Sequence, residues 1–172
     1  TVTLDGALAT YAPNANYNGD DSFTFSVTDG EYIATADVSV SIAAVNDAPV
    51  LAAVSDVSFD EDGSGDLSLS AGDVDGDDLT FSITGGSDIT ATLSGSDVSF
   101  SAPENYNGSE TFTVSVTDGE LSDFQSITVT VNAVNDAPVF ADVLDVSFDE
   151  DGSASITLSA ADVDNSDLEF SI

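Results

Sequence analysis

Acidic side chains recur in short clusters along this sequence, and clusters of that kind can bind a hard cation. The clusters are Asp60-Glu61-Asp62, Asp73-Val74-Asp75, Asp77-Asp78, Asn46-Asp47 and the turn at Asp29. Two carboxylates about 4 Å apart repel by roughly 4 kcal/mol at an effective dielectric of about 20, whereas a whole domain is stable by only about 5–15 kcal/mol. Several clusters that met at one place would therefore need a cation to hold them together.

Calcium is the cation that these residues favour. It takes about 6–8 oxygen ligands from carboxylates, amide side chains and backbone carbonyls, whereas magnesium usually retains more of its water. The chain has no His and no Cys, which are the ligands that favour zinc. The stretch DVDGDD starts like an EF-hand loop, but Thr84 stands at the twelfth position from Asp73, where that loop has Glu. The sequence therefore predicts calcium sites of another kind.

The charge of the chain excludes several classes of partner. The 172 residues include 33 Asp and Glu and no Lys, Arg or His, so the formal net charge is −33. Nucleic acids and anionic membrane surfaces are normally bound through Lys and Arg, and no run of about 18 apolar residues predicts a membrane span. We expect no nucleic acid partner and no direct membrane insertion. An acidic, solubilising surface would explain the total charge, but not clusters that recur at one spacing.

We also expect that the chain is not an enzyme. It lacks His, Cys, Lys and Arg, so the usual nucleophiles and bases are missing. Paired carboxylates alone can hydrolyse glycosides, but here they lie in repeated turn sequences. Five aromatic residues are interpreted as core or turn-packing residues instead of a carbohydrate-binding face: Phe23, Phe25, Phe81, Tyr106 and Phe112.

An internal repeat organises the chain. The phrase AVNDAPV starts at residue 44 and again at residue 133, an offset of 89 residues. The same offset relates FDEDGS at Phe59 and Phe148, and LSAGDVDGDDLTFSI at 69–83 and LSAADVDNSDLEFSI at 158–172. Such regular self-similarity is typical of an array of similar domains.

The phase of the repeat predicts one complete domain and two halves. Residues 50–133 form a complete repeat, residues 1–44 match only its second half, and residues 139–172 match only its first half. Residues 45–49 and 134–138 are the linkers, which Pro49 and Pro138 stiffen. We expect the end of one copy to join the start of the next, either within a longer polypeptide or between separate chains. A boundary without structural meaning is the alternative.

The complete repeat reads as β-strands separated by turns. Apolar and polar residues alternate in SETFTVSV at 109–116 and in QSITVTVNA at 125–133, which places alternate side chains on one face. No segment has convincing helical periodicity. Strands are predicted at 51–59, 66–71, 78–84, 89–94, 97–101, 109–117 and 122–133. About seven short strands in one repeat predict an all-β fold, an antiparallel Greek-key β-sandwich of the cadherin-like or immunoglobulin-like type.

In their order and spacing, these segments resemble the cadherin-like tandem repeats of large bacterial surface adhesins. LSAGDVDGDDLTFSI is similar to the cadherin segment with an Asp-x-Asp pair, and AVNDAPVF resembles the Asn-Asp-x-Ala-Pro linker. The Glu of EDGS lies where cadherins have a first-strand Glu, and SVTDG resembles the late strand that ends in a calcium-binding Asp. The resemblance covers the whole chain and implies a calcium site at each linker.

The resemblance also implies which residues bind the ions. At the first junction these are Asn46, Asp47, Asp73, Asp75 and Asp118. At the second junction they are Glu61 and Glu104 from the preceding domain, Asn135 and Asp136 from the linker, and Asp162 and Asp164 from the following domain. Asp29 would serve the equivalent site one domain earlier. Glu104 has no counterpart at Ala15, so the junction next to Ala15 is expected to bind fewer ions or to bind them more weakly.

These expectations give a structural function. The chain is expected to be an extracellular or cell-surface spacer of an adhesin or a biofilm matrix filament, stiffened by calcium at its linkers. Its partners would be copies of itself, arranged head to tail in a covalent array or a non-covalent filament. The alternative is a β-sandwich module of a secreted protein that binds a surface glycan or another protein.

Overall fold

A computed structural model describes residues 1–172, and its regular elements are all strands. No segment forms a helix with the length and hydropathy of a membrane span. The strands are β1 (Val2–Asp5), β2 (Leu8–Tyr11), β3 (Gly19–Thr28), β4 (Ile33–Ile42), β5 (Val50–Leu51), β6 (Val57–Asp60), β7 (Ser64–Ser68), β8 (Ala71–Gly72), β9 (Thr80–Gly85), β10 (Thr90–Ser94), β11 (Asp97–Ser101), β12 (Gly108–Thr117), β13 (Ser122–Asn132), β14 (Val139–Phe140) and β15 (Ala160–Ala161).

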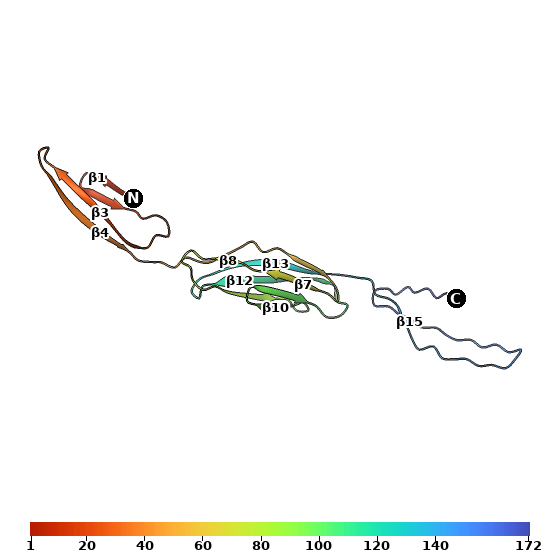
Figure 1. The fold of residues 1–172 in the computed structure, drawn as a ribbon. Coiled ribbons are helices and arrows are strands. Elements are labelled where there is room, and N and C mark those ends of the chain that lie inside the picture. The colour runs from red at the N-terminus through yellow and green to blue at the C-terminus, as the bar shows by residue number, and fades with distance from the viewer. The chain divides into compact units, whose positions relative to one another are not determined.

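The complete repeat is a two-layered sandwich. One sheet has the order β6-β13-β12-β9 and the other the order β10-β11-β7, and β5 pairs with β8 (Figure 1). The alternation predicted for β12 is present, since Phe112, Val114 and Val116 are at most 1% exposed. The rings of Phe100 and Phe112 meet edge to face across the two layers, 5.3 Å apart. The predicted all-β sandwich class is confirmed.

Two details of the sandwich differ from the prediction. The strand expected at 51–59 is interrupted between β5 and β6, because the side chain of Gln125 takes over its backbone hydrogen bonds. The Gln125 amide accepts from Val54 N at 3.0 Å and donates to the carbonyls of Leu51 and Ala52, each at 3.1 Å. In addition, β6 pairs with β13 in parallel, as Val129 opposite Val57 and Val131 opposite Phe59. The sandwich is therefore not purely antiparallel.

The chain divides into two compact units, residues 1–50, 71–80 and 116–123 and residues 51–70, 81–115 and 124–172. Within the first unit, β1 and β2 form one antiparallel pair and β3 and β4 form another. The longer hairpin is in register from Gly19 opposite Ile42 to Thr28 opposite Ile33. Its aromatic rings cluster on one face, where Phe23 and Phe25 meet edge to face with centroids 5.0 Å apart.

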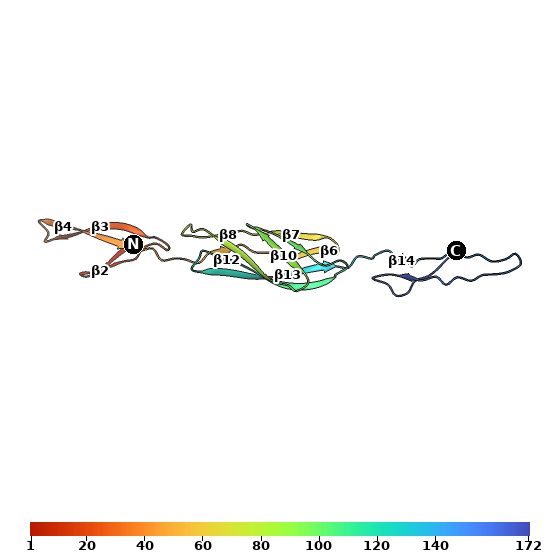
Figure 2. The same ribbon diagram turned by 90° about the horizontal axis from the view of Figure 1, so that it is seen from below.

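Residues 139–172 contain only one short strand pair. In it, Val139 lies opposite Ala161 and Phe140 opposite Ala160. Figure 2 shows most of this segment as chain without strand arrows, and most of its large apolar side chains are exposed, Phe148 by 62%. Although residues 139–172 include many apolar side chains, they do not bury a hydrophobic core of their own.

A carboxylate in β12 closes one turn of the complete repeat. Glu110 accepts hydrogen bonds from Ser87 N at 2.8 Å, Ser87 Oγ at 2.7 Å, and the amides of Asp88 and Ile89, each at 3.1 Å. These donors, the Ser87 side chain first, lower the pKa of Glu110 from 4.5 to about 2. The ionised carboxylate is therefore the form that stabilises the turn.

We expect this turn to give the domain a measurable acid sensitivity. Because the folded-state pKa is depressed, the stabilisation is present above pH 4.5 and is lost as the pH falls toward 2. In urea unfolding, the contribution of Glu110, measured as the difference in stability between the native chain and Glu110→Gln, should therefore fall with acid in this window. Glu110→Gln should flatten that part of the profile, whereas Glu120→Gln, at an exposed turn position, should leave it unchanged. Equal profiles for both variants would contradict this role.

Candidate metal centres

The first junction is built on a tight turn at Asp73. The Oδ1 atom of Asp73 accepts the amides of Asp75 at 2.8 Å and Gly76 at 3.0 Å, and Gly76 adopts the φ of +82° that favours glycine. This turn aims the second oxygen, Oδ2, into a buried position where it has no hydrogen-bond partner. One carboxylate oxygen of each of Asp73, Asp75 and Asp77 lies within 4.8 Å of the others.

The first linker is tied to this turn by its own polar groups. Asp47 N donates to Asp75 Oδ2 at 2.8 Å, and Asn46 Nδ2 donates to Asp118 Oδ2 at 2.9 Å. The amides of Leu121 and Glu120, followed by the Asn46 side chain, lower the pKa of Asp118. The five residues expected at this junction are thus joined by direct contacts, in two groups centred on Asp75 and Asp118.

The second junction repeats the same construction. Asp162 Oδ1 accepts the amides of Asp164 at 2.9 Å and Asn165 at 2.7 Å, and Asp136 N donates to Asp164 Oδ2 at 2.6 Å. Asn135 lies within the same group, since its Oδ1 accepts from Asn165 Nδ2 at 2.8 Å. The linker and the Asp-x-Asp turn therefore adopt one arrangement twice, at positions 89 residues apart.

Glu61 is the most deeply buried charged group of the chain. It is only 6% exposed, and its Oε1 accepts from Val134 N at 2.6 Å, at the start of the second linker. Its Oε2 atom is buried without a hydrogen-bond partner, and so is Oδ2 of Asp136. Burial, followed by repulsion from Asp164, Asp62, Glu61 and Asp162, raises the pKa of Asp136. Five carboxylates therefore crowd together at this linker.

The oxygen atoms present at both junctions are suited to bind a cation. A buried carboxylate oxygen without a donor or a counter-charge costs free energy that only a partner can recover. All three such oxygens in the chain belong to Glu61, Asp73 and Asp136, which are residues predicted to bind calcium. The neighbouring groups offer carboxylate and amide oxygens, the ligand set of a hard divalent ion.

Two predicted ligands make no hydrogen bond to the residues of these groups. Glu104 is exposed, and Asp29 is engaged in its own turn, where it accepts the amides of Glu31 at 2.9 Å and Tyr32 at 2.8 Å. These amides, that of Tyr32 first, lower the pKa of Asp29.

Three residues outside the predicted ligand sets also join these groups, although Asp62 and Asp77 belong to the acidic clusters noted in the sequence. Asp77 joins the first group, Asn165 joins the second, and Asp62 acts on Asp136 electrostatically. Asp62 adopts a φ of +62° and accepts from Asn105 N at 3.1 Å, so the turn directs its side chain toward the neighbouring loop. Their positions in the sequence could have identified two of them as ligands, because Asp62 follows Glu61 directly and Asp77 lies two residues after the Asp73-x-Asp75 pair.

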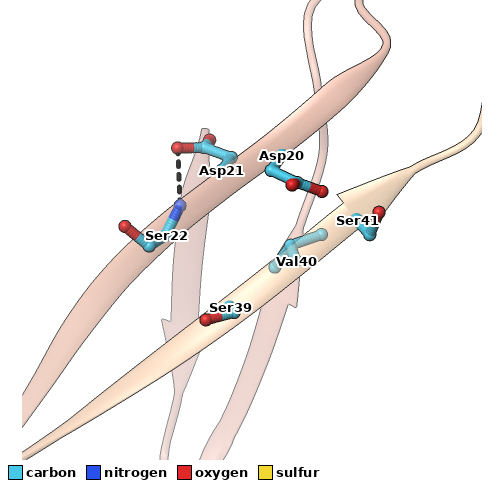
Figure 3. Close-up of a pocket in the computed structure, with 6 residues that line it drawn as sticks. All are labelled: Asp20, Asp21, Ser22, Ser39, Val40 and Ser41. Carbon is cyan, nitrogen blue, oxygen red and sulfur yellow. Dashed lines mark hydrogen bonds between the residues drawn. The ribbon is translucent and has the colours of Figure 1, made fainter.

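A shallow concavity of about 450 Å³ lies along the β3–β4 hairpin, between Asp20–Ser22 and Ser39–Ser41 (Figure 3). Its acidic groups differ from those of the junctions, because both oxygens of Asp21 have partners. Oδ2 accepts from the Tyr11 hydroxyl at 2.7 Å and Oδ1 from Ser22 N at 2.8 Å. The bond to Asp21 raises the pKa of Tyr11 to about 12.

Sequence profiles of two domain families match the chain. A bacterial Ig domain matches residues 46–132, and a cadherin-like domain matches residues 1–43. Among characterised proteins, chitinase A of Pseudoalteromonas piscicida is 35% identical over 105 residues, which is 59% of this chain and 13% of the chitinase. The chain therefore spans a small fraction of that relative's length.

Solved structures of several protein classes are partly similar to the chain. The EC1-2 segment of human protocadherin-24 is 25% identical with a TM-score of 0.45, over 69% of this chain and 62% of that chain. An endo-fucoidan hydrolase of glycoside hydrolase family 107 is 20% identical with a TM-score of 0.40, over 81% and 24%. Titin domains z1z2, in a complex with telethonin, are 15% identical with a TM-score of 0.38, over 78% and 72%.

Proposed function

The chain belongs to the bacterial Ig domain family, and from this premise we propose that it is an extracellular structural repeat whose linkers are stiffened by calcium. The family profiles confirm the resemblance to bacterial cadherin-like repeats, and domains of both matched families are typically extracellular or on the cell surface. Cadherin-like domains generally bind calcium. Ig and cadherin-like domains are typically non-catalytic, and the proposed role needs no catalysis.

The observation that carries this proposal is the set of buried carboxylate oxygens without partners. Oε2 of Glu61 and Oδ2 of Asp136 lie at the second linker, and Oδ2 of Asp73 lies at the first. A chain that only needed solubility would keep its carboxylates in water, where they cost little. Oxygens that are buried and left without donors instead favour a bound cation as their partner.

Calcium at the second linker would join three parts of the chain. Glu61 and Asp62 come from the complete repeat, Asn135 and Asp136 from the linker, and Asp162 and Asp164 from the repeat that follows. An ion held by all three would restrict the linker dihedrals and oppose bending between consecutive repeats. We propose that calcium in this way stiffens an array of repeats, arranged head to tail, in an adhesin or a matrix filament.

Protease sensitivity of the linker tests the proposed stiffening. Elastase cleaves after small apolar residues, and such residues are Val134 and Ala137 in the second linker and Ala133 directly before it. We expect millimolar calcium to slow cleavage at 133–137 by at least tenfold relative to excess chelator, with cut sites assigned by mass spectrometry. Magnesium at the same ionic strength is the control. Equal cleavage rates in calcium and chelator would contradict the proposal.

A second candidate function rests on the relatives that act on polysaccharides. The 35% identity to part of a chitinase favours a secreted polysaccharide-active enzyme as the longer protein, with this chain as a glycan-binding or spacer module. Retention on a chitin column in the presence of chelator would favour glycan binding. Passage through the column without retention would leave the spacer role.

A further inference from the structure

Two asparagines of the chain directly precede a glycine, and the repeat places them at equivalent positions. Asn18-Gly19 and Asn107-Gly108 are related by the offset of 89 residues, and each lies at the start of a long strand, β3 or β12. Every other Asn of the sequence is followed by a residue with a side chain. Because glycine has no Cβ, its backbone nitrogen is the least shielded from the side chain before it. An amide side chain is therefore most open to attack by the main chain in these two pairs.

The backbone path requires the glycine of this pair in the complete repeat. Gly108 has a φ of +154°, a conformation that residues with a side chain rarely adopt. A Cβ at this position would also lie 3.0 Å from the hydroxyl oxygen of Tyr106 and 3.3 Å from Cζ of the same ring. The equivalent Gly19 has a φ of +114°. The fold therefore keeps a glycine after each of these asparagines.

Both asparagines of the Asn-Gly pairs are accessible to water. Asn107 is exposed in the complete repeat, and Asn18 is exposed in the first unit. The linker asparagine Asn46 differs, because its Nδ2 donates to Asp118 Oδ2 at 2.9 Å and so holds the amide in place. Exposure and a following glycine thus occur together only at Asn107 and Asn18.

We propose that Asn107 and Asn18 are sites of spontaneous modification, at which the folded chain converts asparagine to isoaspartate and aspartate with water as the only co-reactant. In the first step, the Gly108 nitrogen loses its proton and attacks Cγ of Asn107. A bond forms between these two atoms, and the bond from Cγ to the side-chain nitrogen breaks. That nitrogen takes up a proton and leaves as ammonia, and the main chain now contains a cyclic imide.

Water then opens the imide at one of its two carbonyl groups. Addition at Cγ breaks the bond from Cγ to the Gly108 nitrogen and gives an aspartate side chain. Addition at the backbone carbonyl breaks the original peptide bond and gives isoaspartate, in which the main chain continues through the β-carbon. Either product adds one negative charge to a chain of formal net charge −33. The isoaspartate also lengthens the main chain by one methylene directly before β12, whose Phe112 and Val114 are buried.

Asp-Gly pairs can form the same imide, but the turns at the metal centres oppose it. The reaction needs a free glycine nitrogen and a neutral carboxyl group, since an ionised carboxylate resists attack. At Asp118-Gly119, the glycine nitrogen donates to Thr117 Oγ1 at 3.1 Å. Backbone amides, that of Leu121 first, lower the pKa of Asp118 and so keep its carboxyl group ionised. The modification is therefore expected at the Asn-Gly pairs and not in this turn.

The new charge at Asn107 arises in a loop that contacts the second metal centre. The loop between β11 and β12 also contains Glu104, and its Asn105 N donates to Asp62 Oδ1 at 3.1 Å. Asp62 is one of the carboxylates that raise the pKa of Asp136 at the second linker. Each conversion at Asn107 therefore adds a like charge to this loop as the protein ages. The inference goes beyond the proposed function, since the reaction needs neither calcium nor a neighbouring copy.

Peptide mapping of the whole chain after incubation tests the proposal. The folded protein is kept in mildly alkaline buffer, where the glycine nitrogen loses its proton more readily, and is sampled over days. Pepsin then digests it in acid, which stops the reaction and is needed because the chain has no Lys or Arg for trypsin. We expect conversion at Asn107 and Asn18 to be at least about tenfold faster than at Asn105, which precedes Tyr106. An isoaspartate methyltransferase labels the isoaspartate fraction.

Asn107→Gln is the matched variant for this experiment. Glutamine keeps an amide at the exposed position, but its longer side chain forms the corresponding imide much more slowly. The variant should lose the labelled peptide that contains position 107 and keep the one that contains Asn18, in calcium and in chelator alike. Asparagine that persists at both positions in the folded chain, or that converts only in urea, overturns the inference. Equal rates at Asn105 and Asn107 also overturn it, because they would show general hydrolysis instead of attack by the glycine nitrogen.

Discussion

We expect calcium to raise the melting temperature of this chain by on the order of 10 °C relative to excess chelator. A ligand that binds only the folded state adds about 2.7 kcal/mol at a concentration of about 100 times its Kd. For a domain of roughly 60–100 residues, each kcal/mol corresponds to about 4–8 °C. The shift should be large here because, without the ion, buried oxygens such as Oε2 of Glu61 lack any partner.

The melting experiment must distinguish stabilisation by bound calcium from the general screening of charge repulsion by salt. A net charge of −33 makes any salt stabilising to some extent, because counter-ions reduce self-repulsion. Calcium and magnesium are therefore compared at equal ionic strength, with sodium chloride as the reference. If all three salts gave the same shift, the carboxylates would be a solubilising surface and the calcium sites would be refuted.

The second large effect is expected from Glu61→Gln, and its sign should depend on calcium. The variant keeps an oxygen that can accept from Val134 N, but it replaces the partnerless Oε2 with a neutral group. In calcium the variant should be less stable than the native chain by about 2–3 kcal/mol, since a charged ligand is lost. In chelator the difference should vanish or reverse, since a buried, unpaired charge is removed.

Urea unfolding in both buffers measures this reversal, and two matched variants interpret it. Asp66→Asn removes one charge from an exposed strand position and should behave alike with and without calcium. Glu104→Gln tests a ligand that the family resemblance implies but that the structure leaves exposed, so we expect a smaller calcium-dependent effect than for Glu61→Gln. A loss of stability for Glu61→Gln that was the same in both buffers would mean that Glu61 is only a structural hydrogen-bond acceptor.

The strands could be predicted from the sequence because alternation of apolar and polar residues is a local pattern. Alternation in 109–116 specifies which side chains face inward, and Phe112, Val114 and Val116 are indeed buried. Alternation does not specify which strand lies alongside, so the parallel pairing of β6 with β13 was not predicted. The break between β5 and β6 was also missed, because it depends on Gln125, more than 70 residues away in sequence.

The candidate metal sites could be predicted from the sequence where their motifs occur twice. Asp73 and Asp75, and again Asp162 and Asp164, were identified by the Asp-x-Asp spacing, and their turns have the same hydrogen bonds. Glu104 shows the limit of this reasoning, since an acidic residue in the expected region need not be buried there, and Glu104 is exposed. Burial distinguishes Glu61 as a candidate ligand from Asp60 and Asp62, its neighbours in the sequence, which are equally acidic but exposed. The sequence alone does not reveal this difference.

A calorimetric titration of calcium into the metal-free chain tests the central claim most directly. If the linkers bind calcium, the heat should saturate at a small whole number of ions per chain, and 0.15 M sodium chloride (a Debye length of about 8 Å) should weaken the binding only partly. Glu61→Gln should remove or weaken part of that binding. Heat that never saturates and disappears with sodium chloride would show a diffuse counter-ion cloud around an acidic surface, and would contradict calcium sites at the linkers.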